Sequence, residues 1–271
     1  HKDDPGLSIN IAPHAPYSVT AEALQASMRL AEELDTTWQI HLSETEEERQ
    51  NAIKEFGCSP VEYLAKLGCL NERTIAVHCV ALSDRDIGLL AESGASVVHC
   101  PVSNMRLGCG ASPVVKLLKA GINVALGTDG AASACSLSMF EQMRTAGLIA
   151  KGFSQDPTEL TVNQIIRMAT INGANALKLH CDVGSLAVGK LADLAVIDMS
   201  QLVTMPVLDV LSNVIYAVEA QCVHQVWVSG SLVANIQQEK LLRPDRGKLL
   251  TKSNIMSWQN RVCEILRDDF N

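Results

Sequence analysis

The sequence predicts an α/β protein of the (β/α)8 barrel class. Short apolar runs of strand length recur at intervals of about one strand–helix unit, and ionisable residues stand where the runs end. His41, His78 and His99 close three of these runs, and Asp129 follows the fourth within Gly127-Thr-Asp-Gly130. Barrels of this class keep their chemistry at the carboxyl ends of their strands. We therefore predict strands over residues 37–42, 74–80, 96–100 and 122–126.

Helix signals fill the intervals between these strands. Thr20 is a suitable N-cap for the segment that follows it, and Ser83-Asp84-Arg85-Asp86 is typical of a helix start. Gly121 ends another helical segment. A strand–helix alternation of this kind predicts a parallel sheet with right-handed crossovers. A short strand is predicted over 9–12, before the first helix. The predicted helices cover residues 21–34, 44–56, 61–67, 84–94, 113–120, 137–150 and 161–179.

The character of the chain changes after residue 180. The stretch from Gly184 to Asp193 contains turn-like breaks and leads to a predicted strand over 194–197. Two further strands, 223–228 and 232–235, flank Ser229-Gly230-Ser231, which is typical of a hairpin turn. An amphipathic segment over 249–270 predicts a helix. We thus expect a barrel region over 1–180, a small β region over 181–240 and a helical tail over 241–271.

Composition narrows the classes of partner. The 271-residue chain is 47% hydrophobic, which is ample for a core, and it carries a net charge of −8. That charge argues against a nucleic acid or an anionic membrane surface as a partner. No apolar run reaches the length of a membrane span, and no signal peptide precedes the first strand. The nine cysteines form no Cys-x-x-Cys pair, which favours buried thiols in a reducing cytoplasm.

The individual polar residues admit ordinary structural interpretations. His41 and Glu44, three residues apart, would also suit a structural histidine beside a helix start, and His78 alone would suit a buried core histidine. Asp129 is different, because an acid directly after a buried strand is costly unless it is hydrogen-bonded, paired or bound to a metal. Several ionisable residues nevertheless stand at strand ends, one strand–helix unit apart, and this is unexpected if each is only structural. The pattern favours a metal-ligand set of imidazoles and a carboxylate.

Four motifs resemble the amidohydrolase superfamily: His41-Leu-Ser-Glu44, His78-Cys-Val80, His99-Cys-Pro-Val-Ser-Asn-Met-Arg-Leu107 and Leu126-Gly-Thr-Asp-Gly-Ala-Ala-Ser133. The residues of these motifs are most similar to those of one branch of the superfamily, the 5′-methylthioadenosine/S-adenosylhomocysteine deaminases and triazine hydrolases. The stretch from Gly184 to Leu194 resembles the point where that family re-enters its small β-sandwich. The resemblance runs from about residue 9 to 235. It implies an amidohydrolase-type TIM barrel, of which this sequence covers about strands 4–8, with part of a composite β-sandwich.

The resemblance also implies roles for individual residues. His41 and Asp129 would be metal ligands, and Asp129 would also accept a proton from the attacking water. Glu44 would protonate the ring nitrogen beside the attacked carbon, and His78 would help activate the water or steady the developing oxyanion. His14 would end the fourth strand and contact the purine together with Glu44 and Asp129. A histidine at 14, where binuclear members carry a carboxylated lysine, favours one divalent ion, zinc or alternatively iron.

The implied reaction is hydrolytic deamination of an adenosine-type nucleoside to the inosyl product and ammonia. S-adenosylhomocysteine, 5′-methylthioadenosine and adenosine are the expected substrates. Bound zinc lowers the pKa of water from 15.7 to roughly 7, and a carboxyl group within hydrogen-bond reach can supply the ring proton. The other zinc-deaminase signature, His-x-Glu with Pro-Cys-x-x-Cys, is absent. Guanine-type deamination and triazine dechlorination stay open as alternatives, and so does a homo-oligomer.

Two departures from the family pattern stand out. The family carries a His-x-His pair at the end of its first barrel strand, and no two histidines here are two positions apart. We therefore expect an N-terminal part to lie outside this sequence. Were the 271 residues the whole protein, we would expect neither a tight zinc site nor turnover, and an inactive fragment serving as a binding subunit is the alternative. The second departure is Ala134-Cys-Ser-Leu-Ser138, where the family has Asn-Asn-Asp-Leu-Asp.

Overall fold

The computed structural model describes residues 7–235 and the two-residue strand at 240–241. The chain divides into two compact units, His1–Ser185 and Leu186–Asn271. Each unit has its own sheet. The helix predicted over 249–270 lies outside the described residues.

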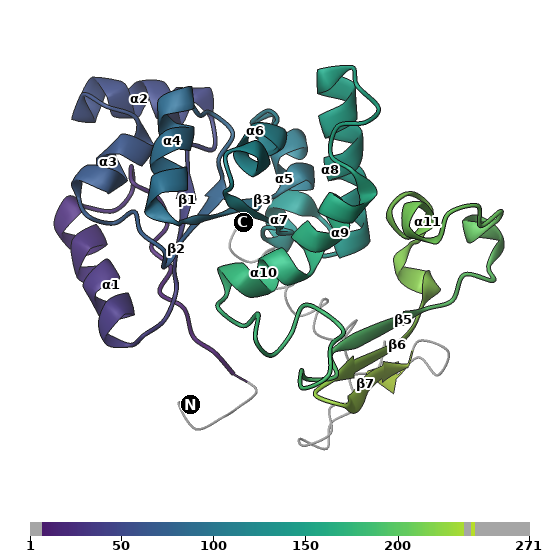
Figure 1. Ribbon diagram of the computed structural model, residues 1–271. Helices are drawn as coiled ribbons and strands as arrows, with labels where there is room; N and C mark the ends of the chain where they lie inside the picture. Colours follow the sequence, from purple (N-terminus) through teal and green to yellow (C-terminus); the bar gives the residue numbers. More distant parts are fainter. Residues whose placement is uncertain (1–6, 236–239, 242–271) are drawn as a thin grey trace, which may run out of the picture. The chain divides into compact units, whose positions relative to one another are not determined.

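The first unit is built on a four-stranded parallel sheet in the order β1-β2-β3-β4 (Figure 1). Parallel pairing sets Leu42 of β1 opposite His78 of β2, and His99 of β3 opposite Leu126 of β4. The carboxyl ends of neighbouring strands therefore lie at one edge of the sheet, as the sequence predicted. The strands are β1 (Trp38–Leu42), β2 (Thr74–His78), β3 (Ser96–His99) and β4 (Asn123–Leu126).

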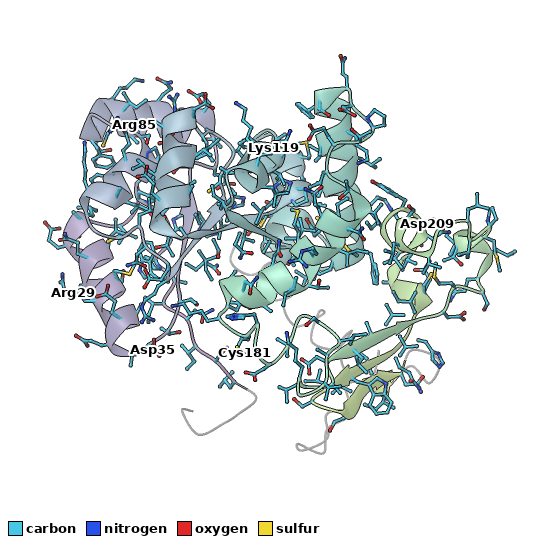
Figure 2. All side chains as sticks on the ribbon, in the orientation of Figure 1. Arg29, Asp35, Arg85, Lys119, Cys181 and Asp209 are labelled. Carbon is cyan, nitrogen blue, oxygen red and sulfur yellow. The ribbon has the colours of Figure 1, made fainter. Side chains whose placement is uncertain are left out.

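Helices follow the strands in alternation and cover the sheet. The interior is apolar, with Trp38, Ile40 and Leu42 of β1 almost inaccessible to solvent and every residue of β2 buried. Charged side chains such as Arg29 and Arg85 lie on the outer helix surfaces (Figure 2). The helices are α1 (Ala21–Glu33), α2 (Glu46–Phe56), α3 (Pro60–Lys66), α4 (Asp84–Ser93), α5 (Pro101–Arg106), α6 (Val114–Lys119), α7 (Ala131–Ala134), α8 (Met139–Ser154), α9 (Val162–Ala169) and α10 (Ile171–Ala176).

Three local predictions differ from the structure. The expected strand over 9–12 is reduced to one parallel bridge between Ile11 and Trp38, because Pro13 has no N–H to continue the ladder. Between the strand expected over 96–100 and the helix expected over 113–120, where no helix was predicted, the structure has α5, whose first residue Pro101 suits a first helical position. The helix expected over 161–179 divides into α9 and α10 at Thr170, whose backbone angles are not helical.

A buried carboxylate joins the starts of α3 and α4. Asp86 is fully buried and accepts hydrogen bonds from the backbone N–H and the hydroxyl of Ser83, at 2.8 and 2.7 Å. It also accepts the hydroxyl of Ser59, the N-cap of α3. The several donors compensate the cost of burying a charge. These two helix starts are thereby held in register beside the sheet.

The second unit contains an antiparallel sheet in the order β5-β6-β7-β8. Strands β6 and β7 are joined by Ser229 and Gly230, both with positive φ, as a tight hairpin turn requires. This confirms the predicted hairpin. No helix within the described residues is long and apolar enough to cross a membrane. The elements are β5 (Leu194–Ile197), α11 (Val210–Tyr216), β6 (Val223–Val228), β7 (Ser231–Asn235) and β8 (Lys240–Leu241).

Candidate active site

His41, His78 and Asp129 come together at the carboxyl edge of the parallel sheet. His41 lies in β1, His78 ends β2, and Asp129 follows β4. One possible ligand atom from each lies within 4.8 Å of the corresponding atoms of the other two. Segments 88 positions apart in the sequence thus contribute to one cluster, which we call the His41–His78–Asp129 cluster.

The backbone turns sharply where these side chains are presented. Ser43, His78, Cys79 and Asp129 all adopt positive φ, between 48° and 74°. Residues other than glycine rarely adopt this left-handed backbone conformation, and each such residue costs of order 1–3 kcal/mol of folding free energy. The turns carry the chain out of the strand directions at the strand ends, where the functional side chains lie.

Hydrogen bonds fix the tautomers of both imidazoles. Nδ1 of His41 lies 2.8 Å from the backbone oxygen of His14, and Nδ1 of His78 lies 2.8 Å from Oδ1 of Asn104. Both partners are acceptors, so each Nδ1 carries hydrogen and donates. Nε2 is therefore the nitrogen of each ring that is left to bind a metal ion. An outer hydrogen bond of this kind is the usual orienting device for a metal-binding histidine.

Asp129 is held as a carboxylate. The hydroxyl of Ser103 donates to Oδ2 at 2.6 Å. Burial acts to raise the pKa of Asp129, but the Ser103 hydroxyl and the backbone N–H of Gly130 outweigh it, so the pKa lies below its ordinary value. The neighbouring thiol of Cys100 is buried beside Asp129, which raises its pKa to about 12. Cys100 therefore stays protonated at neutral pH when no metal ion is bound, and it is not one of the three residues whose ligand atoms converge.

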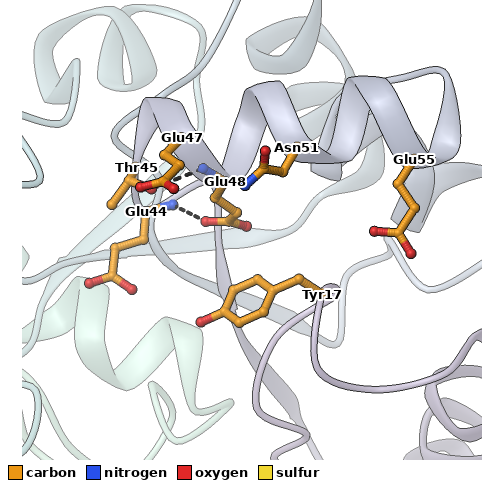
Figure 3. A pocket seen from close by; sticks show the side chains of 7 residues that line it. All are labelled: Tyr17, Glu44, Thr45, Glu47, Glu48, Asn51 and Glu55. Carbon is orange, nitrogen blue, oxygen red and sulfur yellow. Dashed lines mark hydrogen bonds between the residues drawn. The ribbon is translucent and has the colours of Figure 1, made fainter.

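Glu44 stands next to the His41–His78–Asp129 cluster. Its Oε2 lies 3.8 Å from Nε2 of His78, and its side chain is 22% exposed. The Cys109 thiol donates to Oε1 at 3.4 Å, and burial together with the charge of Glu44 raises the pKa of Cys109 to about 11. Glu44 also lines a cavity of about 530 Å³, whose other lining residues are Tyr17, Thr45, Glu47, Glu48, Asn51 and Glu55 (Figure 3).

The remaining two histidines of the predicted set are placed differently. The ring of His14 is exposed, its centroid is 5.2 Å from that of His41, and its Nδ1 is bonded to Ser18 Oγ. His99 is buried, lines a separate cavity of about 330 Å³ beside α6 and α8, and does not join the cluster. Unlike His78, it has no left-handed backbone to turn it out of the strand. Burial, and secondarily His78, lowers the pKa of His99 to about 3, so it is neutral.

Two contributing residues were not singled out from the sequence. Ser103 and Asn104 of α5 are fully buried and contact Asp129 and His78 respectively. They lie within the motif His99–Leu107, in a stretch for which no helix was predicted. Recognising Pro101 as the first residue of a helix would have placed both side chains on one short turn beside the strand ends.

The donor set of the cluster fits a divalent cation. Two imidazole nitrogens and one carboxylate oxygen are ligands that zinc and iron accept in catalytic sites. The hydrogen bonds from His41 to the His14 carbonyl and from Ser103 to Asp129 supply the outer contacts that such ligands need. The arrangement has the chemistry of a hydrolytic metal site.

Residues 1–233 match the Amidohydrolase family. The chain belongs to this family. It is 44% identical over 262 residues to a 5-methylthioadenosine/S-adenosylhomocysteine deaminase of Teredinibacter turnerae, covering 97% of this chain and 58% of that protein. It is 41% identical to a 5′-deoxyadenosine deaminase of Methanothermobacter thermautotrophicus, covering 85% of this chain and 53% of that protein.

Solved structures agree with this membership of the amidohydrolase family. A zinc-bound adenosine deaminase from Xanthomonas campestris superposes with a TM-score of 0.89 at 40% identity, covering 97% of this chain and 59% of that chain. A zinc complex of atrazine chlorohydrolase from Arthrobacter aurescens gives 0.78 at 25% identity, over 88% of this chain and 51% of that one. The predicted amidohydrolase fold is confirmed: the chain contains part of an α/β barrel and a separate antiparallel sheet. The chain spans between half and three fifths of the length of these relatives.

Proposed function

We propose that the protein is a metal-dependent deaminase of adenosine-type nucleosides. The observation that carries this proposal is the His41–His78–Asp129 cluster with the Glu44 carboxylate 3.8 Å from His78. Deaminases of S-adenosylhomocysteine, 5′-methylthioadenosine, 5′-deoxyadenosine and adenosine among the relatives support the substrate class. In the reaction, water adds to C6 of the purine, the bond from C6 to the amino nitrogen breaks, and ammonia leaves.

His41 and Asp129 would hold the cation, and Nε2 of His78 is within reach of the same position. When bound, the cation lowers the pKa of water to roughly 7 and so supplies a nucleophile at neutral pH. The zinc complexes among the structural relatives favour zinc.

The protein's own groups would move the protons. The Asp129 carboxylate, kept ionised by Ser103, can accept a proton from the attacking water and pass it to the departing amine. Glu44, when it carries a proton, can protonate the ring nitrogen next to C6 as aromaticity is lost, and it regains a proton from the C6 hydroxyl as the carbonyl of the product forms. Nε2 of His78, which lies close to both carboxylates, can accept a hydrogen bond from the attacking water and so help to activate it. His14, exposed beside His41, would contact the purine.

Ammonia release is the direct test. The protein made from its complete coding sequence, loaded with zinc, would be assayed with S-adenosylhomocysteine, 5′-methylthioadenosine, 5′-deoxyadenosine and adenosine. Guanine and a chlorotriazine serve as the rival substrates. Release of ammonia from the adenosine-type compounds, with kcat/KM at least about tenfold above that for guanine, supports the proposal. Activity on guanine or the triazine alone would show that the proposed substrate class is wrong. If the protein neither binds metal nor turns over any substrate, the alternative of a catalytically inactive binding subunit is favoured.

The eight cysteines in the described part of the chain are free thiols, most of them buried. This supports a cytoplasmic location, where thiols stay reduced. Fractionation of the native cells with an antibody against the protein tests it.

A further inference from the structure

One side chain of α2 turns back onto the loop that carries Glu44. The Glu48 carboxylate accepts the backbone N–H of Ser43 at 3.0 Å through Oε1 and that of Glu44 at 2.6 Å through Oε2 (Figure 3 shows the second contact). Each oxygen takes one donor, so a single carboxylate spans two successive peptide groups. Glu48 thus contacts the backbone of Glu44, while the Glu44 side chain points away from it.

The geometry of this loop explains why an anion is needed there. Ser43 has a φ of 51°, and two successive N–H groups around a left-handed residue converge on one point, a known anion-binding arrangement. Here the anion is supplied by the chain itself. The hydrogen bonds to a charged acceptor are the strong kind, and they offset the cost of the left-handed turn.

The same turn is tied to the neighbouring strand end. The carbonyl oxygen of Ser43 accepts the backbone N–H groups of Val80 and Ala81, both at 2.9 Å, in the loop that follows His78. The turn at Ser43 therefore connects the His41–Glu44 loop with the loop after His78. A shift of this turn would move Glu44 relative to His78.

Glu48 is itself firmly placed. It is the third residue of α2, its backbone N–H donates to Oγ1 of the N-cap Thr45, and its side chain is partly buried. Burial raises the pKa of Glu48, against the lowering effect of the two backbone N–H groups. The carboxylate is thus a partly buried group with two specific partners, both in the loop that carries Glu44.

We propose that Glu48 is a positioning residue, whose carboxylate locks the left-handed turn at Ser43 and so fixes where Glu44 delivers its proton. The inference rests on the proposed function for the role of Glu44. Glu48 itself would not touch the substrate or the metal. Its effect would fall on the rate of the chemical step and leave metal binding by His41 and Asp129 intact.

Glu48→Gln is the informative variant, because it keeps the size of the side chain. The amide oxygen can accept one of the two N–H groups, but the amide nitrogen is a donor and would face the other. The matched control is Glu46→Gln, the same change two residues earlier on α2. Glu46 is exposed and bonded to Arg49 and Gln50 of its own helix.

The experiment uses the zinc-loaded protein from the complete coding sequence and has two arms. In the kinetic arm, Glu48→Gln should lower kcat by at least about tenfold with KM within about threefold of the parent, because the loss falls on the transition state. Its zinc content should match the parent. In the second arm, hydrogen exchange at the Ser43 and Glu44 amides should be at least about tenfold faster than in the parent. Glu46→Gln should change neither.

The outcomes separate the two proposals. An unchanged kcat in Glu48→Gln overturns the positioning role, and so does a loss of zinc or a fall in Tm beyond about 10 °C, since either shows general support of the fold. A parent protein without ammonia release contradicts the proposed function instead. In that case the hydrogen-exchange measurement alone tests the role of Glu48. If exchange at the Ser43 and Glu44 amides is unchanged in Glu48→Gln, the Glu48 carboxylate does not hold the turn at Ser43.

Discussion

One backbone oxygen, that of His14, accepts two hydrogen bonds from His41: from its backbone N–H at 3.0 Å and from its ring Nδ1 at 2.8 Å. The same atom therefore sets the position of the residue beside the preceding segment and the tautomer of its imidazole. The segment before His41 orients the candidate metal ligand through its main chain. The side chain of His14 is left exposed and available for another purpose.

Replacing the His14 ring should consequently separate metal binding from substrate binding. His14→Ala keeps the carbonyl that orients His41, so zinc content should equal that of the parent. Loss of a purine contact should raise KM by about tenfold while kcat changes less. Metal analysis and steady-state kinetics measure the two effects. A variant that loses zinc would show that the ring, rather than the carbonyl, supports His41.

Asp129→Asn tests the carboxylate of the cluster. The amide is nearly the same size and can still accept from Ser103, but it has lost the negative charge that zinc and the proton transfer require. Affinity for zinc should fall by at least about tenfold and kcat by at least about a hundredfold. Asp35→Asn, an exposed residue paired with Arg73, is the control. Chelation should inactivate the parent and added zinc restore it; recovery of full activity by Asp129→Asn would contradict the assignment.

Asn104 should matter through His78. Asn104→Ala removes the acceptor for the Nδ1 hydrogen, so the ring can rotate or change tautomer, and kcat should fall by roughly tenfold or more. Asn104→Asp retains an acceptor oxygen and should keep more activity than the alanine variant. Both variants should bind zinc through His41 and Asp129. If the Asn104→Ala variant is as active as the parent, Asn104 has no role in catalysis.

The burial of His99 lets us predict how the free energy of unfolding depends on pH. Its pKa is lowered to about 3 by burial, so between that pH and its ordinary value of 6.5 the unfolded chain binds a proton that the folded chain does not. Stability should therefore fall as pH falls through this window, by up to about 1.4 kcal/mol per pH unit from this group.

His99→Leu is the variant that isolates this effect. Leucine has a similar volume, and within the described residues the Nδ1 of His99 has no hydrogen-bond partner to lose. Urea unfolding at a series of pH values between 6.5 and 4 should show a flatter dependence for His99→Leu than for the parent. Identical slopes would assign the acid sensitivity to other groups.

The sequence predicted the sheet and its carboxyl edge well, because both depend on local patterns. Runs of apolar residues define the strands, and residues at strand ends share an edge whatever lies between them. His41, His78, Glu44 and Asp129 could be selected on this basis. The position of His99 could not, since which side of a strand faces the pocket depends on backbone turns that its own run does not encode.

The supporting contacts were beyond prediction for a related reason. Ser103, Asn104 and Glu48 each act through one or two hydrogen bonds across 4 to 26 positions, and such pairings carry no periodic signal. The short helix α5 was missed because its six residues, of which Pro101 is the first, are too few to show an amphipathic repeat. Only the three-dimensional arrangement shows that these polar side chains face the reactive residues.

The left-handed residues at Ser43, His78 and Asp129 have a consequence for engineering. Part of the backbone strain in the described residues lies where the proposed chemistry occurs, and relaxing it there would be one route to a more heat-resistant protein. Ser43→Gly would remove the side-chain penalty of the turn but also widen the range of shapes open to the loop. Heat resistance and catalytic power are therefore in competition at this site, and attempts to improve the first should begin elsewhere in the barrel.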